Sequence, residues 1–160
     1  MLRKPISWRA LLFFLLFPLL VGLVAGLLIR DQLPLYQAIN KPPFSPPSAL
    51  FPIVWTILYL LMGYSAYLVF QSQSAGRQAA LSVFFLQLLC NFFWPLIFFN
   101  LQAYLTAFLW LVTLFLLVLY QSILFYEISA KAALLMSPYL LWLLFAGYLN
   151  FGVFLLNRPL

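Results

Sequence analysis

Histidine is absent from this sequence, cysteine occurs once, and there are only two acidic residues. These absences exclude a Ser-His-Asp triad and leave too few ligands for a zinc or di-iron cluster, so no metal site is predicted. The two acids, Asp31 and Glu127, fall at the ends of apolar runs, which argues against a paired-carboxylate glycosidase. The single Cys90 has no second cysteine with which to form an intramolecular disulfide.

Charge is scarce throughout the 160 residues. Lys, Arg, Asp and Glu make up 6% of the chain, hydrophobic residues make up 67%, and the mean hydropathy is +1.10. A soluble domain carries about 25% charged residues, so this chain lacks the polar surface that water requires. The 20% aromatic content excludes disorder. We therefore predict an integral membrane protein whose main partner is the lipid bilayer. Its +6 charge is spread over segment ends, which favours snorkelling anchors over a nucleic-acid surface.

Five apolar runs are each long enough to cross about 30 Å of hydrocarbon as a helix. Their length and uniform apolarity favour helices over the alternating strands of a membrane barrel. The sequence thus predicts an all-α membrane protein, a single five-helix domain spanning residues 1–160, with helices at about 10–29, 49–70, 79–101, 103–126 and 132–156. The first run lacks a clear cleavage site and exceeds the usual apolar core of a signal peptide, so we interpret it as a retained helix.

The longest connection, residues 30–48, is rich in proline: Pro34, Pro42, Pro43, Pro46 and Pro47. Proline at this density cannot continue a helix, so the whole segment is predicted to be a loop. Its apolar and aromatic residues favour an ordered lid over one mouth of the bundle. The turn near residues 100–102 is very short, so the third and fourth helices are predicted to be antiparallel neighbours. Pro95 is predicted to kink the third helix.

Basic residues give a preference for orientation. One side is predicted to hold Arg3, Lys4, Arg9, Arg77 and Lys131, and the other Arg30, Lys41 and Arg158. The positive-inside rule then places the N-terminus in the cytoplasm and the proline-rich loop outside.

Polar and small residues inside the runs indicate which faces point toward protein, because lipid-facing positions have little reason to be polar. Helical spacing predicts three such stripes: Trp55, Tyr59, Met62/Gly63 and Ala66; Asn91, Trp94 and Phe98; and Trp142, Ala146, Leu149/Asn150 and Val153. Gly22 and Gly26 form a GxxxG motif in the first helix, which favours close packing within the bundle over dimerisation.

Two interpretations of these stripes are open. The asparagines can be interhelical hydrogen-bond partners, and the tryptophans can belong to the interfacial aromatic belt, which Trp8 fits well. Alternatively, the Trp, Tyr and Asn side chains line a pocket for a flat, mainly apolar ligand. Trp55, Trp94 and Trp142 lie deeper in their runs and fit the belt less well, whereas Trp110 is ambiguous.

Four motifs resemble the tryptophan-rich sensory protein/translocator protein family, the peripheral benzodiazepine receptors. They are NKPPFSPP at 40–47, VWTILYLLMGY at 54–64, NFFWPLIFF at 91–99 and PYLLWLLFAGYLN at 138–150. The resemblance extends from about Leu16 to Asn150. The chain departs from the family at Phe44, where a Trp is usual, and at Phe151, which replaces a sterol-associated Tyr, so the C-terminal cholesterol motif is absent.

The resemblance implies a five-helix bundle, commonly a homodimer, that binds porphyrins such as protoporphyrin IX and haem. Transferred position by position, the family's ligand pocket falls on Phe51, Trp55, Tyr59, Asn91, Trp94, Trp142, Ala146, Leu149 and Asn150. A porphyrin or haem would be a ligand here, and no obligatory cofactor is predicted. The resemblance also favours a multi-pass location in a bacterial cell membrane.

Three functions are compatible with these residues. The first is tetrapyrrole sensing, regulation or transport. The second is light-dependent porphyrin degradation, in which the bound porphyrin is the sensitiser and Trp94 or Trp142 is the reactive indole. The third is a structural membrane subunit without a specific ligand. A secondary transporter is disfavoured because the runs contain no intramembrane acid or arginine and no inverted repeat.

Overall fold

The computed structural model of the chain describes residues 6–157, which are helical over most of their length. The elements are α1 (Trp8–Ile29), η1 (Arg30–Gln32), α2 (Leu33–Ala38), α3 (Leu50–Gln71), α4 (Arg77–Pro95), η2 (Leu96–Asn100), α5 (Tyr104–Ile128) and α6 (Ala130–Asn157). Within this part of the chain there is no β-strand. Arg3, Lys4 and Arg158, which contributed to the predicted orientation, lie outside the described residues.

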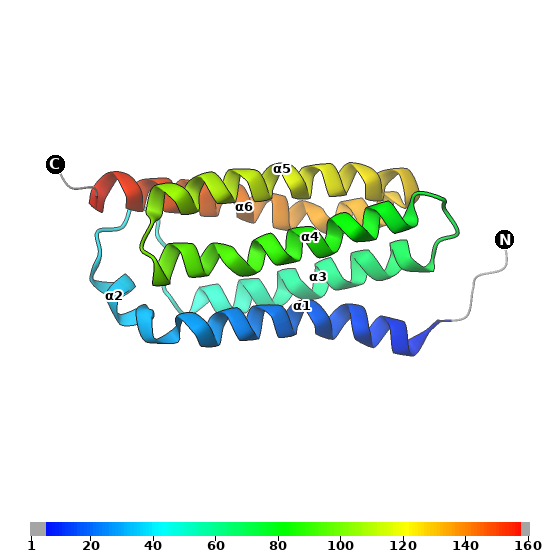
Figure 1. Cartoon of the computed structure of the whole chain (residues 1–160), viewed down its shortest axis with the longest axis horizontal. Coiled ribbons are helices and arrows are strands. Elements are labelled where there is room, and N and C mark those ends of the chain that lie inside the picture. Colours follow the sequence, from blue (N-terminus) through cyan, green and yellow to red (C-terminus); the bar gives the residue numbers. More distant parts are fainter. Residues whose placement is uncertain (1–5, 158–160) are drawn as a thin grey trace.

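The five predicted spans are confirmed as helices long and apolar enough to cross a membrane. They run antiparallel in sequence order, and the N-terminal end of α1 and the C-terminal end of α6 lie at opposite ends of the bundle (Figure 1). The helices pack in the ring order α1, α3, α6, α5, α4, with α4 returning to α1. The predicted antiparallel pairing of the third and fourth spans is therefore observed as α4 against α5.

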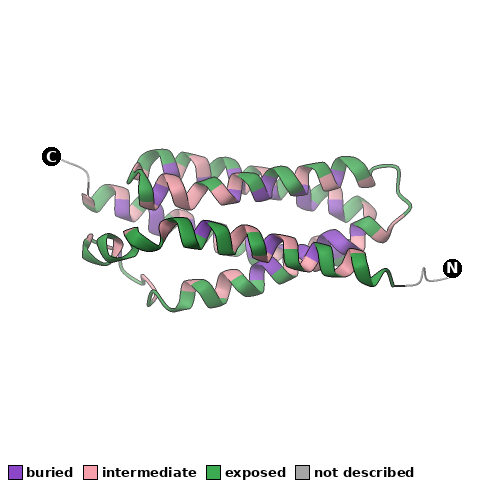
Figure 2. Cartoon of the chain, turned by 60° about the horizontal axis from the view of Figure 1, so that its bottom comes forward, coloured by how far each residue is buried: buried purple, intermediate pink, exposed green. Residues whose placement is uncertain are grey.

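Buried residues lie along the inward sides of the helices, and the outer sides are exposed (Figure 2). The exposed side chains are mostly apolar, as in Leu16, Leu23 and Leu116. An apolar exterior around an interior that contains asparagine, glutamine and tyrosine is the distribution expected of a protein whose surroundings are hydrocarbon.

The prediction of a loop over residues 30–48 was wrong for its first half. Residues 30–38 are helical, in η1 and α2, and the irregular segment begins at Ile39. Pro34 lies in the first turn of α2, where a helix has no intrahelical partner for the missing N–H. The other four prolines fall between residues 42 and 47, and the chain is not helical there. Phe44, at the loop tip, has a φ of 63° and an 88% exposed side chain.

Pro95 marks a change in helix type. The α-helical part of α4 ends at this residue, and one π-helical turn, η2, follows it. Proline lacks the N–H that would donate to the Asn91 carbonyl, so the α-helical hydrogen-bond pattern is already interrupted before η2 begins. The turn brings Phe98 and Phe99 against Tyr36 of α2, at ring-centroid distances of 5.9 and 5.2 Å.

The irregular loop, residues 39–49, is fastened to the C-terminal end of α6. The Asn157 carboxamide pairs with the backbone of Asn40: it accepts from the Asn40 N–H at 3.0 Å and donates to the Asn40 carbonyl at 2.8 Å. The Tyr148 hydroxyl donates to the Pro43 carbonyl at 2.9 Å. Gly152 allows the backbone of α6 to lie directly against the Pro42 ring of the loop, because a Cβ at this position would lie 2.6 Å from that ring.

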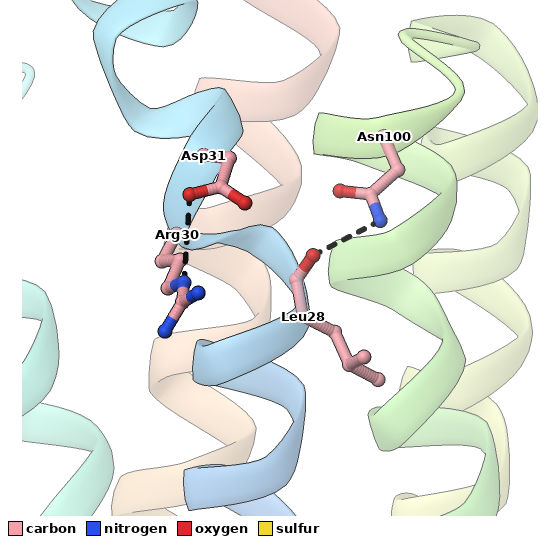
Figure 3. A network of polar contacts seen from close by, with 4 residues as sticks. All are labelled: Leu28, Arg30, Asp31 and Asn100. Atoms are coloured by element: carbon pink, nitrogen blue, oxygen red, sulfur yellow. Dashed lines mark hydrogen bonds and ion pairs between the residues drawn. The ribbon is translucent and has the colours of Figure 1, made fainter.

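A second contact joins the end of α1 to η2. The Asn100 carboxamide donates to the Leu28 carbonyl at 3.2 Å, and the Arg30–Asp31 ion pair is a separate contact beside it (Figure 3). The side chains of that pair are 68% and 83% exposed, so water screens it and it contributes little to stability. The Asn100 hydrogen bond and the Tyr36–Phe99 ring contact join this end of α1 and α2 to η2.

Replacing Asn157 with leucine is expected to loosen the loop without unfolding the bundle. The variant loses both hydrogen bonds to the Asn40 backbone, so amide hydrogen exchange in residues 39–49 should accelerate by about tenfold. Mass spectrometry of the detergent-solubilised protein measures this. Ser137→Ala, which removes a local hydrogen bond on an exposed face of the same helix, is the matched control. Unchanged exchange in the loop of the Asn157 variant would contradict the tether.

Candidate functional site

A hydrogen-bonded triad joins three helices in the middle of the bundle. The Tyr59 hydroxyl of α3 donates to Asn91 Oδ1 of α4 at 2.8 Å, and Asn91 Nδ2 donates to the Tyr139 hydroxyl of α6 at 2.6 Å. All three side chains are buried. Asn91 thus satisfies both a donor and an acceptor across helix boundaries, which fixes the positions of α3 and α6 relative to α4.

A second polar cluster lies closer to the loop end. The Trp94 indole N–H of α4 donates to Asn150 Oδ1 of α6 at 3.2 Å, and Asn150 Nδ2 donates to the Tyr104 carbonyl of α5 at 2.8 Å. Trp94 also packs against Phe98, with ring centroids 5.6 Å apart. Both asparagines therefore form interhelical hydrogen bonds, as one of the two interpretations of the sequence predicts.

The aromatic side chains of the predicted pocket pack on different neighbours. Trp55 lies 5.4 Å from Tyr59 and 6.0 Å from Tyr139, measured between ring centroids. Trp142 forms an edge-to-face pair with Phe51 at 5.9 Å and a tilted pair with Phe145 at 5.6 Å. The indoles of Trp55, Trp94 and Trp142 are all half-buried.

One polar atom in this wall is unsatisfied. The Nε1 atom of Trp142 is buried and has no hydrogen-bond partner among the described residues. A buried N–H without an acceptor costs about 1–3 kcal/mol. The indole N–H of Trp142 is therefore an unpaired hydrogen-bond donor inside the bundle, and its ring packs next to those of Phe51 and Phe145.

Other predicted residues lie where the helical stripes place them. Ala146 and Leu149 are buried on α6, and Phe51 lies in the first turn of α3, beside Trp142. Trp8 is 66% exposed at the start of α1, as expected of a belt residue. The ambiguous Trp110 is half-buried, and its indole donates to the Cys90 carbonyl at 2.8 Å, which joins α5 to α4.

Tyr139 and Tyr104 belong to these clusters but were absent from the predicted set. Tyr139 could have been found, because it precedes Trp142, Ala146 and Asn150 by three, seven and eleven residues on the same face of α6. Tyr104 takes part through its backbone carbonyl, for which its side chain type gives no signal.

Gly22 lies directly against the phenol ring of Tyr59. A Cβ at this position would overlap the ring, whereas at Gly26 nothing lies within 4 Å of the added atom. Packing within the bundle, predicted for the GxxxG motif, is therefore confirmed for Gly22. The close approach of α1 helps to hold Tyr59 in the position where it reaches Asn91.

The site is electrically neutral at its centre, and its charges lie at the loop. Lys41 Nζ lies 4.7 Å from the centroid of the Tyr36 ring and donates to the Gln37 carbonyl at 3.3 Å. Among the described residues, no group of three or more His, Cys, Asp or Glu side chains could hold a metal ion. The arrangement thus combines aromatic surfaces and hydrogen-bonding groups inside the bundle with a cation, Lys41, at the loop end.

A small hollow opens beside the second cluster, between α2, η2 and α5. Its cavity volume is about 10 Å³, far below the 300–1,000 Å³ or so of typical small-molecule sites. Its lining comprises Gln32, Leu35, Tyr36, Phe98, Phe99, Gln102 and Tyr104. None of the nine predicted ligand-binding residues lines this hollow.

The family described as TspO/MBR matches residues 14–156 of the chain. The chain belongs to the TspO/MBR family. A tryptophan-rich protein TspO from Archaeoglobus fulgidus is 39% identical over 122 residues, which is 76% of this chain and 79% of the relative. Protein CrtK from Rhodobacter capsulatus is 37% identical over 124 residues, covering 76% and 78% of the two chains. The translocator protein of Bos taurus is 30% identical over 155 residues, covering 94% and 92%.

This membership agrees with the apolar exterior and the five spans. This TspO/MBR protein is a multi-pass integral membrane protein of the sensory/translocator type. The matched region includes both polar clusters, the irregular loop and the whole of α3, α4 and α5.

Proposed function

We propose that this TspO/MBR protein binds a flat, largely apolar tetrapyrrole such as protoporphyrin IX or haem between α3, α4 and α6, and acts in tetrapyrrole sensing, regulation or transport. The observation that carries the proposal is the buried Trp142 N–H, which has no hydrogen-bond acceptor among the described residues. The indole that carries it packs against the ring of Phe51. A planar ligand with acceptor atoms at its edge would satisfy that donor while stacking on the neighbouring indoles.

The contacts between the side chains of the proposed site are weak enough to separate when a ligand enters. The Trp94–Asn150 bond is long at 3.2 Å, and the aromatic pairs around Trp142 are edge-to-face or tilted rather than closely stacked. Separating such contacts costs little free energy. Burying the apolar surface of a macrocycle is favourable by about 25 cal/mol per Å², which would exceed that cost. Trp55 and Trp142 would then supply stacking surface, and Asn150 and Tyr59 would supply polar contacts.

The charged edge of a porphyrin is expected at the loop. Lys41 lies on the loop and Arg30 lies in η1 at the same end of the bundle (Figure 1). Both cations are located where propionate groups would leave the hydrocarbon, and charge-assisted hydrogen bonds to carboxylates are the stronger kind. The relatives include a tryptophan-rich sensory protein from Cereibacter sphaeroides and the translocator protein of Bos taurus, and this similarity supports a sensory or translocating role. The cytoplasmic N-terminus, the bacterial membrane and the homodimer stay predictions.

Tryptophan fluorescence during titration with protoporphyrin IX tests the proposal. Saturable quenching is expected for the unmodified protein, and Trp142→Phe is expected to weaken the apparent affinity by about tenfold, because it removes the donor and one stacking indole. Trp8→Phe, at the exposed belt position, is the matched control and should leave the affinity unchanged. Saturable quenching with the same affinity in both Trp142→Phe and Trp94→Phe would refute the assigned site.

A further inference from the structure

We propose that the hollow between α2, η2 and α5 is a carboxylate subsite, which receives one propionate arm of the tetrapyrrole. The inference rests on the proposed function and deepens it, because it names the part of the ligand that binds at the loop end. It also assigns a role to residues of α2, η2 and the turn before α5 that the predicted pocket leaves out.

Four of the residues that line the hollow have side chains that donate hydrogen bonds. Carboxamides come from Gln32 and Gln102, and phenols come from Tyr36 and Tyr104. An ionised carboxylate only accepts hydrogen bonds, and each of these side chains has an N–H or O–H to donate. The cavity volume of about 10 Å³ is that of a single oxygen-sized group. The leading oxygen of a carboxylate therefore fits the hollow, whereas a pyrrole ring does not.

A lysine supplies positive charge beside the hollow. Lys41 Nζ lies 4.7 Å from the centroid of the Tyr36 ring, and that residue is part of the lining. The Gln37 carbonyl accepts one hydrogen bond from Nζ at 3.3 Å, and an ammonium group has three N–H donors. The acid at this end of the bundle, Asp31, is paired with Arg30 at 3.4 Å. The local charge therefore favours an anion, and charge-assisted hydrogen bonds to a carboxylate are the stronger kind.

A single aromatic ring joins the hollow to the tetrapyrrole site. The Phe98 ring packs against Trp94, with centroids 5.6 Å apart, and against Tyr36 and Tyr104 at 5.9 and 5.2 Å. Trp94 belongs to the proposed tetrapyrrole site, whereas Phe98 and the two tyrosines line the hollow. A propionate arm is a short methylene chain that ends in a carboxylate, and it is comparable in length to one such ring. It can therefore reach the hollow while the macrocycle stays against Trp94.

The backbone of Gln102 allows the ligand role of this residue to be separated from a structural one. Its φ of 52° lies in the left-handed region, which glycine adopts more easily than glutamine. Strained residues of this kind cluster at ligand sites. Glycine at position 102 would relax the backbone and at the same time remove the carboxamide from the hollow.

Titrations with protoporphyrin IX and with its dimethyl ester, followed by tryptophan fluorescence at neutral pH, test the subsite. The ester keeps the macrocycle and lacks the ionised carboxylates. Gln102→Gly is expected to weaken the apparent affinity for the free acid by about fivefold, because a hydrogen bond to a charged group is lost, and to change that for the ester by less than about twofold. Its melting temperature should not fall, because glycine suits the left-handed backbone.

Two further variants keep the packing of the hollow. Tyr36→Phe removes the hydroxyl and keeps the ring against Phe98 and Phe99, and it should weaken binding of the free acid by about threefold. Lys41→Met keeps the methylene stem and removes the cation, and it should weaken binding of the free acid by about tenfold. Gln73→Gly is the matched control, because Gln73 is exposed in the turn at the other end of the bundle (Figure 1). It should alter neither affinity.

Each comparison is made within one ligand, so the different partition of the two forms into detergent does not enter. If both ligands bind saturably and the variants change neither affinity, the hollow takes no carboxylate and the tetrapyrrole site stands without it. Variants that weaken both forms equally would show that these residues support the bundle instead of binding the carboxylate. Absence of saturable binding by either form would refute the tetrapyrrole site, and the subsite with it.

Discussion

Gly63→Ala is expected to lower the melting temperature of the solubilised protein by about 10 °C or more. A Cβ at Gly63 of α3 would overlap the Phe14 carbonyl oxygen of α1 and lie 2.9 Å from the carbonyl carbon and 3.1 Å from the Leu15 Cα. These are backbone atoms, so no side-chain rotation relieves the contact. The helices must move apart, and interhelical packing is a main source of stability in a membrane bundle.

The displacement of α1 in Gly63→Ala is also expected to disturb contacts away from Gly63. Phe14 is buried and packs with Phe70 at 5.2 Å and Phe84 at 6.2 Å between ring centroids, which joins α1 to α3 and α4. A shift of α1 disturbs these pairs. It also moves Gly22, on the same helix, away from the Tyr59 ring.

Gly26→Ala is the matched control for this prediction. It adds the same methyl group to the same pair of packed helices, but nothing lies within 4 Å of the new atom. Its melting temperature should stay within about 2 °C of the unmodified protein, since the gain in helix propensity is below 1 kcal/mol or so. Equal losses in the two variants, measured by differential scanning fluorimetry, would show that the α1–α3 crossing is not as close as described.

The helices were predictable from the sequence because the bilayer imposes a length and a polarity on each span. The stripe that carries Trp55 and Tyr59 was predictable for the same reason: in a span with few polar residues, their spacing indicates the inward face. Tyr59, Asn91 and Asn150 indeed lie inside the bundle. The pairing of Gly22 with Tyr59 was only partly predictable, because GxxxG indicates close approach but does not name the neighbour.

The remaining features depend on tertiary contacts. The helical character of residues 30–38 was missed because Pro34 was counted with the later prolines, although proline is tolerated in a first helical turn. The pairing of Asn157 with the Asn40 backbone joins residues 117 positions apart, and a carboxamide near a chain end gives no signal for it. Gln87, one turn before Asn91, could have been added to the polar stripe of α4 from its spacing alone.

Asn91→Leu is expected to be comparably destabilising, for an electrostatic reason instead of a steric one. The change leaves the Tyr59 and Tyr139 hydroxyls buried without the partner that joined them. Each stranded hydroxyl costs about 1–3 kcal/mol, so the melting temperature should fall by about 10 °C. Asn100→Leu is the matched control, because Asn100 makes a single bond to the Leu28 carbonyl at an exposed position, and its loss should cost much less.

The stability lost in Asn91→Leu is expected to be partly recovered when the two tyrosine hydroxyls are also removed. Combining Asn91→Leu with Tyr59→Phe and Tyr139→Phe removes all the stranded hydroxyls and leaves an apolar contact of similar shape. Replacing both partners of a hydrogen bond by apolar groups is nearly neutral, so the triple variant should recover at least half of the stability lost in Asn91→Leu. If the triple variant instead melts lower by the sum of the single losses, the three side chains stabilise the bundle independently and do not act as a hydrogen-bonded unit.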